Sequence, residues 1–248
     1  MAKNTGKQKA RYSRSITLIV LVIACLLVVF MVGGRNRLKD IDVVCLNGEI
    51  TESQKNEIIR ASGLKMGAQI GSISDVEGAV AEGVNSTGFA RFESVARIST
   101  GGVQLIVTVR QPIAIVNAGG NYILIDDEGM VMEIRERMPS DSVVYVTGAD
   151  ATNYSKGKKL VLRKENQLKD IIRIASAIKN MGYQATYSEL NVKDLRDIYL
   201  VTNTNQIIEI FDGKDIEQTL QMVDEIIKSG NVNGKITVSG NYAGYSPK

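Results

Sequence analysis

The sequence predicts an α+β protein in three parts: an N-terminal transmembrane helix, a domain ordered β-α-α-β-β, and a mainly antiparallel β domain with two helices. Three observations predict it. An uncharged apolar run, Ile16–Val32, lies near the start of the chain. Two helix-start signals precede two β-rich runs, and beyond Pro112 short strands alternate with glycine turns. With 44% hydrophobic and 23% charged residues, the 248-residue chain can bury a core.

The apolar run predicts the first part. Ile16–Val32 has seventeen residues and no charge, close to the lower limit of about 17 residues for a helix that spans hydrocarbon. We therefore expect a transmembrane helix over residues 16–34, with the cytoplasmic membrane as its partner. Cleavage of the run as a signal peptide is the alternative, but the nearest small-residue site, Met31-Val32-Gly33, is a poor one.

The charges around this run predict its orientation. Residues 1–15 contain lysine and arginine without an acid, whereas the basic residues after the run are soon joined by Asp40 and Asp42. Because the more basic side of a membrane helix faces the cytoplasm, residues 1–15 are expected to be a basic cytoplasmic tail. The expected localisation is the cell membrane, as a single-pass protein whose C-terminal part is extracytoplasmic.

Two scarcities limit the chemistry that the chain can perform. It has no histidine, which excludes Ser-His-Asp and Cys-His catalysis and imidazole metal sites. Its two cysteines, Cys25 inside the apolar run and Cys45 beyond it, cannot supply a four-cysteine zinc site. Residues 35–248 carry 25 basic and 27 acidic residues, a net charge of −2, which is unlike the basic face of a nucleic-acid-binding domain. We expect no nucleic-acid partner, no metal and no cofactor.

Residues 38–112 are expected to form the β-α-α-β-β domain. Thr51-Glu52-Ser53-Gln54 and Ser74-Asp75-Val76-Glu77 are capping boxes, each opening a helix, and the first of these helices stops at Gly63. The strands that this pattern predicts are Ile41–Cys45, Phe92–Ser99 and Val103–Val109, of which the last two form a hairpin.

Residues 113–248 are expected to form the mainly antiparallel β domain. Glycine-containing turns separate its short strands, and helical periodicity marks two segments, one ending near Gly182 and one near Gly230. The expected strands are Ile113–Asn117, Tyr122–Asp126, Met130–Ile134, Ile198–Thr202, Ile207–Phe211 and Lys235–Ser239. The residues after Ser239 are expected to be a polar tail.

This order resembles the bacterial cell-division family FtsQ, called DivIB in some lineages. Ile41–Gly48 looks like the family's opening strand and turn of its POTRA domain, and Gly63–Gly67 like the loop between the POTRA helices. Ile106–Ala114 resembles the junction where the family usually has Val-x-Glu-Arg-x-Pro-Val-Ala, with Val109 where the acid is usual. The resemblance covers nearly the whole chain and makes residues 38–112 a POTRA domain.

The resemblance implies a function without catalysis. Family members are scaffolds of the divisome, enriched at the division septum, that bind FtsB-like or DivIC-like and FtsL-like proteins and so help to assemble and regulate septal peptidoglycan synthesis. It also implies no small-molecule substrate. By resemblance, a partner strand adds to the terminal strand of the second domain, and Arg97 and Arg110 are expected to serve interactions of the POTRA domain. The expected partner-binding residues are Lys235, Ile236, Thr237, Val238, Ser239, Tyr242 and Tyr245.

Two other functions fit parts of the sequence. A membrane-anchored POTRA-type chaperone or export module would also bind strands, although tandem POTRA copies would then be expected. A cell-wall serine enzyme would need Ser-x-x-Lys, which occurs at Ser62–Lys65, Ser155–Lys158 and Ser176–Lys179. Because this short pattern occurs three times in one chain, it carries little weight, and a scaffold remains the favoured function.

Overall fold

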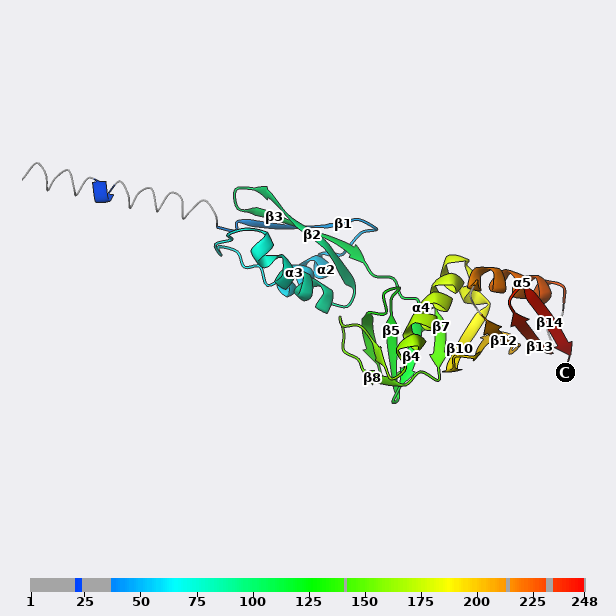
Figure 1. Ribbon diagram of the computed structural model, residues 1–248. Coiled ribbons are helices and arrows are strands. Elements are labelled where there is room, and N and C mark those ends of the chain that lie inside the picture. Colours follow the sequence, from blue (N-terminus) through cyan, green and yellow to red (C-terminus); the bar gives the residue numbers. More distant parts are fainter. Residues whose placement is uncertain (1–20, 24–36, 141, 213–214, 231–233, 248) are drawn as a thin grey trace, which may run out of the picture. The chain divides into compact units, whose positions relative to one another are not determined.

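The computed structural model describes residues 21–23, 37–140, 142–212, 215–230 and 234–247 (Figure 1). The predicted basic tail, residues 1–15, lies outside these ranges, as does most of the predicted transmembrane helix at 16–34. In the ranges that are described, no helix combines the length and the apolar character needed to cross a membrane. This finding overturns the fold class that included a transmembrane helix, and with it the expected single-pass placement in the cell membrane.

The described part is a mixed α/β fold that consists mostly of sheet. By its contacts the chain divides into two compact units. Unit 1 contains the described residues up to Glu82 together with Phe92–Val107, and unit 2 contains Gly83–Arg91 and the described residues from Thr108 onward. The sequence predicts one boundary, at residue 112, between two continuous domains. In the structure the short segment Gly83–Arg91 belongs to unit 2, although the residues on both sides of it belong to unit 1.

The first sheet has three strands in the order β1-β3-β2. Its elements follow one another as β1 (Asp40–Cys45), α2 (Glu52–Ala61), α3 (Ser74–Ser86), β2 (Ala90–Ser99) and β3 (Gly102–Val109). β1 runs parallel to β3 with Ile41 beside Val103 and Val43 beside Leu105. These apolar side chains are buried together with Ile58 of α2, so one face of the sheet supplies the core of unit 1.

Local sequence determines where the first two helices begin. Thr51 caps α2 as expected, because its hydroxyl accepts from the Gln54 N–H while the Gln54 side chain accepts from the Thr51 N–H. The start of α3 differs from expectation. Ser74 is already inside the helix, and the Asp75 carboxylate accepts from the N–H of Ser72. Asp75 therefore stabilises the start of α3, and Ser74 does not act as the N-cap.

The second sheet has nine strands in the order β14-β13-β12-β11-β10-β7-β4-β5-β6. A separate two-stranded ribbon pairs β8 (Ala151–Asn153) with β9 (Val161–Leu162). The helices are α4 (Glu165–Asn180) and α5 (Ile216–Lys228), with a 3-10 turn at Tyr183–Ala185. The nine strands are β4 (Ala114–Ala118), β5 (Asn121–Ile125), β6 (Val131–Arg135), β7 (Val144–Thr147), β10 (Tyr187–Asp194), β11 (Asp197–Thr202), β12 (Ile207–Asp212), β13 (Gly234–Ser239) and β14 (Tyr242–Pro247).

This sheet is mixed: most of its neighbouring strands pair antiparallel, as expected, and three pairs are parallel. The pairs β4–β7, β7–β10 and β12–β13 are parallel. Neighbouring parallel strands need a long connection, and two of these pairs have a helix in it. α4 lies in the chain between β7 and β10, and α5 between β12 and β13. The two helices that the sequence predicts are therefore the elements that make their flanking strands parallel.

One row of apolar side chains crosses this sheet and forms the core of unit 2. Each member of the row is the cross-strand neighbour of the next, and all pack in the same cluster as α4 and α5. Since neighbours in register share a face, both helices cover the same side of the sheet. From β5 to β14 the row is Ile123, Val116, Val146, Leu190, Leu200, Ile208, Ile236 and Tyr245.

Candidate partner-binding edge

The segment expected to bind a partner, Lys235–Ser239, lies inside the sheet. It forms most of β13, which pairs with β12 on one side and with β14 on the other. Both rows of backbone groups are therefore used within the chain, and β13 offers no free edge for strand addition. The edge position belongs to β14, Tyr242–Pro247, the last strand in the order (Figure 1).

A tight turn produces this difference. Ser239 is paired with Tyr242, so only Gly240 and Asn241 separate the two strands. Gly240 has a φ of 57°, the left-handed value that a two-residue hairpin of type II′ requires at its first central position. The expected polar tail therefore folds back as a strand. The Gly-Asn dipeptide was the signal in the sequence for this turn.

The side chains of β13 alternate between two roles. Ile236 and Val238 are completely buried and belong to the core. Lys235 and Thr237 lie on the opposite face of the sheet, which the row of apolar neighbours places away from α4 and α5. Of the five residues expected to touch a partner through this strand, two are thus core residues.

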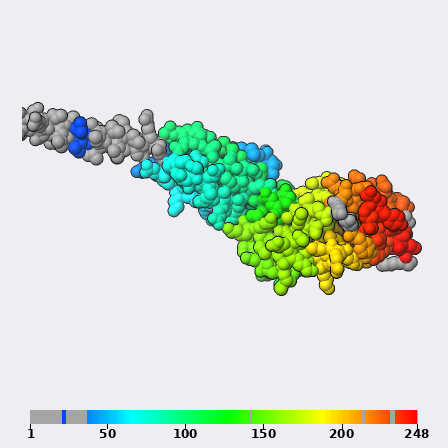
Figure 2. All heavy atoms as spheres, in the orientation of Figure 1, coloured from blue at the N-terminus to red at the C-terminus, as the bar shows by residue number. Residues whose placement is uncertain are grey.

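The two tyrosines of β14 also differ from one another. Tyr242 is 71% exposed, whereas Tyr245 is half-buried and packs against the core at the end of the apolar row. Gly234 permits this packing, because a Cβ there would lie 2.8 Å from the Tyr245 ring and 2.3 Å from the Ser246 carbonyl oxygen. Tyr245 thus packs β14 against β13, whereas the Tyr242 side chain is exposed. Figure 2 shows the C-terminal segment, in red, at the surface.

The hairpin register indicates which backbone groups of β14 point outward. Ser239 and Tyr242 flank the turn, so they form a hydrogen-bonded pair, and the pairs then alternate along the strands. Ala243 is in the alternate class, which turns its N–H and C=O away from β13. Pro247 ends the strand and has no N–H. The outward edge therefore begins with a donor and an acceptor at Ala243 and is limited by Pro247.

A polar network covers the other face of the sheet beside β14. Lys235 Nζ lies 2.6 Å from Glu209 Oε2 and 5.9 Å from the centre of the Tyr199 ring. The Tyr199 hydroxyl is within hydrogen-bond distance of Asp197 and is 3.1 Å from Glu209 Oε1. Thr237 donates to Glu209 over 3.4 Å. The network joins three neighbouring strands, β11, β12 and β13.

The charges within this network shift two pKa values. Burial alone would raise the pKa of Glu209, but hydrogen bonds from Lys235 and Tyr199 outweigh it and hold that pKa below its usual value. The hydrogen bond from Tyr199 to Asp197, with burial, raises the pKa of the tyrosine. Glu209 is therefore ionised and Tyr199 protonated near neutral pH. Ile207 and Phe211, which are 39% and 47% exposed, lie on the same strand as Glu209.

Arg97 lies on β2 in unit 1. Its guanidinium donates to the carbonyl oxygens of Ile70 and Gly71, over 3.3 and 2.9 Å. The side chain thereby ties β2 to the loop that precedes α3. Its expected role in an interaction with another protein stays a prediction.

Arg110 is buried, with 2% of its side chain exposed. Its guanidinium contacts Asp126, donates to Glu128 over 2.9 Å, and donates to Asn85 Oδ1 over 3.0 Å. Its backbone N–H donates to the Phe89 carbonyl oxygen. Because the guanidinium is enclosed by groups of its own chain, Arg110 has no surface with which to contact a partner directly.

The acids at the end of β5 and in the turn after it are part of this charged cluster. Asp126 is fully buried, and Arg91 lies 2.6 Å from Asp127 and 3.2 Å from Glu128. Burial alone would lower the pKa of Arg91, but the carboxylates of Asp127 and Glu128 raise it. The signal that was missed is the pairing of two arginines, Arg91 and Arg110, with three consecutive acids of the same unit.

The described residues contain no group of three or more cysteine, aspartate or glutamate side chains arranged to hold a metal ion. Comparison with known proteins adds no identification: no family model matches the chain, and no curated protein matches it. The site is therefore interpreted from its own geometry.

Proposed function

We propose that this chain is a non-catalytic scaffold that binds a partner protein by β-strand addition at β14. The observation that carries the proposal is the position of β14 at the end of a nine-stranded sheet, with the backbone of Ala243 turned outward. An exposed strand edge is a template for another chain's backbone, and the exposed Tyr242 is the type of aromatic anchor that stabilises such contacts.

The apolar row of the core indicates the chemistry of the partner strand. This row ends at Tyr245, and the strand added next would place a side chain beside it on the side covered by α5. An apolar residue there would continue the row, while its neighbours in sequence would face the polar network and solvent. The partner segment is thus an alternating apolar and polar strand. The resemblance to FtsQ and DivIB supports FtsB-like or DivIC-like and FtsL-like division proteins as partners.

The test is a binding titration of the full chain with the purified FtsB-like or DivIC-like protein of the same organism. Ala243→Pro removes the outward N–H with little change in side-chain size, and we expect it to weaken binding about tenfold or more. The matched control is Ala151→Pro, which changes a half-buried alanine of the two-stranded ribbon and should leave the affinity unchanged. Circular dichroism of both variants checks that the sheet remains folded.

Unchanged affinity of the folded Ala243→Pro variant would overturn strand addition at β14. Absence of binding by the unmodified chain would overturn the division partner. An export module, the alternative function, predicts instead that unfolded polypeptides of unrelated sequence bind as well as the division protein.

A further inference from the structure

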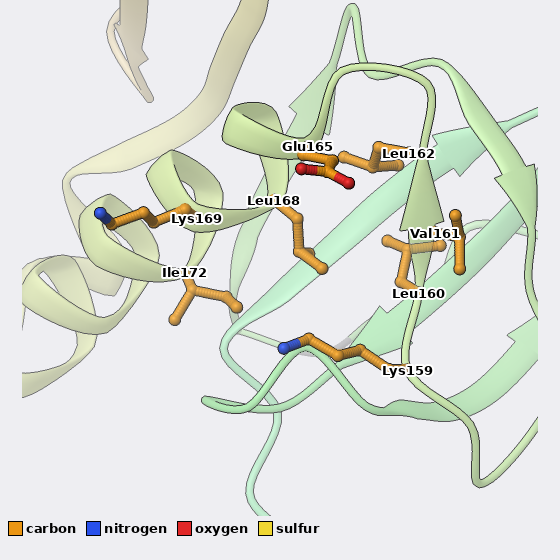
Figure 3. A pocket seen from close by; sticks show the side chains of 8 residues that line it. All are labelled: Lys159, Leu160, Val161, Leu162, Glu165, Leu168, Lys169 and Ile172. Atoms are coloured by element: carbon orange, nitrogen blue, oxygen red, sulfur yellow. The ribbon is translucent and has the colours of Figure 1, made fainter.

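We infer that a groove between α4 and the segment before it is a binding site for a single-chain fatty-acid carboxylate. The groove lies in unit 2, has a volume of about 530 Å³, and is independent of the strand edge proposed above. This volume is within the range of about 300–1,000 Å³ typical of small-molecule sites. It is lined by Lys159, Leu160, Val161, Leu162, Glu165, Leu168, Lys169 and Ile172 (Figure 3).

Helical spacing creates one wall of the groove. Glu165, Leu168, Lys169 and Ile172 are three or four residues apart and therefore share one face of α4. Leu168 points into the space between helix and strand in Figure 3. From Glu165 to Ile172 this face advances by seven steps, or about 10 Å at a rise of 1.5 Å per residue. This wall is therefore long enough to run beside most of an extended alkyl chain.

The segment before α4, residues 159–162, forms the opposite wall through its side chains and not through unpaired backbone N–H or C=O groups. The N–H groups of Gly157, Leu160 and Arg163 donate to the carbonyl oxygens of Val131, Gly129 and Asp150. Val161 and Leu162 are paired with β8. Because this backbone is already hydrogen-bonded, the wall offers little to a peptide strand. It suits a ligand whose body is purely apolar.

The floor of the groove is apolar, and part of it is open to solvent. Leu160, Leu162 and Leu168 are buried, whereas Val161 on the rim is 48% exposed. An exposed valine beside a recess of this size leaves apolar surface in contact with water. Covering that surface is the favourable contribution that an alkyl chain would make.

The charges around the groove favour an anionic headgroup. Residues 155–169 contain six lysines and arginines and one acid, Glu165. In the described part of the chain, neither Lys159 nor Lys169 has an ion-pair partner. In Figure 3 the Lys159 side chain extends toward Ile172, while Glu165 lies at the opposite end near Leu162. The carboxylate would therefore bind at Lys159, with the chain directed along Val161 and Leu168 toward Leu162.

The test is titration of the full chain with monomeric laurate, followed by the methyl NMR signals of Ile172 and Leu168. The Ile98 methyl, 50% exposed on β2, reports unrelated surface binding. We expect laurate to shift the groove methyls and to leave Ile98 unchanged. 1-Dodecanol has a chain of the same length and an uncharged headgroup, and we expect it to bind at least about tenfold more weakly, because it forms no ion pair with Lys159.

Two variants with matched controls test the groove itself. Lys159→Glu should weaken laurate binding about tenfold, whereas Lys65→Glu, an exposed lysine of unit 1, should not. Val161→Asp should weaken it similarly, whereas Leu46→Asp, 64% exposed elsewhere, should not. Equal binding of laurate and 1-dodecanol, equal binding by both members of each pair, or shifts produced only by acidic peptides or anionic vesicles would each overturn the assignment.

Discussion

At the scale of single residues, Arg110 shows how a resemblance in sequence can conceal a structural role. The signature of the FtsQ and DivIB family, which this segment resembles, places an acid directly before the arginine, and here Val109 occupies that position. The structure supplies the missing negative charge from Asp126 and Glu128, which follow it in the chain by 16 and 18 residues. Arg110 therefore keeps a carboxylate partner although the neighbouring acid is absent.

Replacing Arg110 should destabilise unit 2 strongly. Arg110→Gln leaves the fully buried Asp126 without its closest cation, and removal of one member of a buried ion pair costs about 3–5 kcal/mol. Urea unfolding measures this loss. The control is Arg163→Gln, which breaks the exposed pair with Asp150 and should cost about 1 kcal/mol or less. Equal effects of the two variants would show that the Arg110 cluster is not a stabilising contact.

At the scale of elements, the sequence identified most segments with strong patterns, but it missed β7, whose residues Val144–Thr147 favour a strand. The helices from Glu165 and Ile216 and the strands β4, β5, β6, β11 and β12 lie close to their expected positions. β10 was missed, since a register shift near Glu189 breaks its alternation and it includes Asn191, Lys193 and Asp194. β14 was missed because it contains Gly244 and Pro247, which disfavour strands.

For the same reason, the edge strand was expected at β13, whereas the edge lies at β14. The pattern of Lys235–Ser239 predicts a strand, and this strand exists as part of β13. Whether it lies at an edge depends on the residues after it, which have little strand propensity of their own. Their pairing is stabilised by contacts across strands, such as the Tyr245 ring over Gly234. Only the Gly-Asn turn marked that pairing in the sequence.

The contact between β12 and β13 should make stability depend on pH in the acidic range. Lys235, Tyr199 and Thr237 surround Glu209 and favour its ionised form, so its pKa is lower in the folded chain than in the unfolded chain. The stabilisation is therefore complete above the ordinary glutamate pKa of 4.5 and is lost as the pH falls through the folded value.

Urea midpoints measured between about pH 6 and pH 3 check this expectation. Glu209→Gln should reduce the midpoint at the higher pH and flatten its decrease toward the lower pH. The exposed Glu136→Gln is the control and should leave the slope unchanged. A slope that is the same in Glu209→Gln and in the unmodified chain would contradict the expected contribution of Glu209.

At the scale of the whole unit, the nine-stranded sheet is connected through one apolar core. The cluster extends from Ile113 to Val238 in sequence and includes both α4 and α5. Ile171 of α4 and Leu220 of α5 are both fully buried in it. In the order of the sheet, the row of side chains passes from β5 through each neighbouring strand to β14. Unit 2 should therefore unfold as a single cooperative body.

Leu220→Ala tests this cooperativity from one end of the core, and Ile171→Ala is its counterpart in α4. Each removes buried methyl groups and should cost about 2–5 kcal/mol. Native-state hydrogen exchange measures the free energy of opening for the slowly exchanging amides of β5 and β12. Within each variant, we expect this free energy to fall by the same amount in both strands. Loss confined to β12 in Leu220→Ala would contradict a single core. In that case α5 and its flanking strands would open separately, and the edge at β14 would belong to a less stable part of the sheet than the rest.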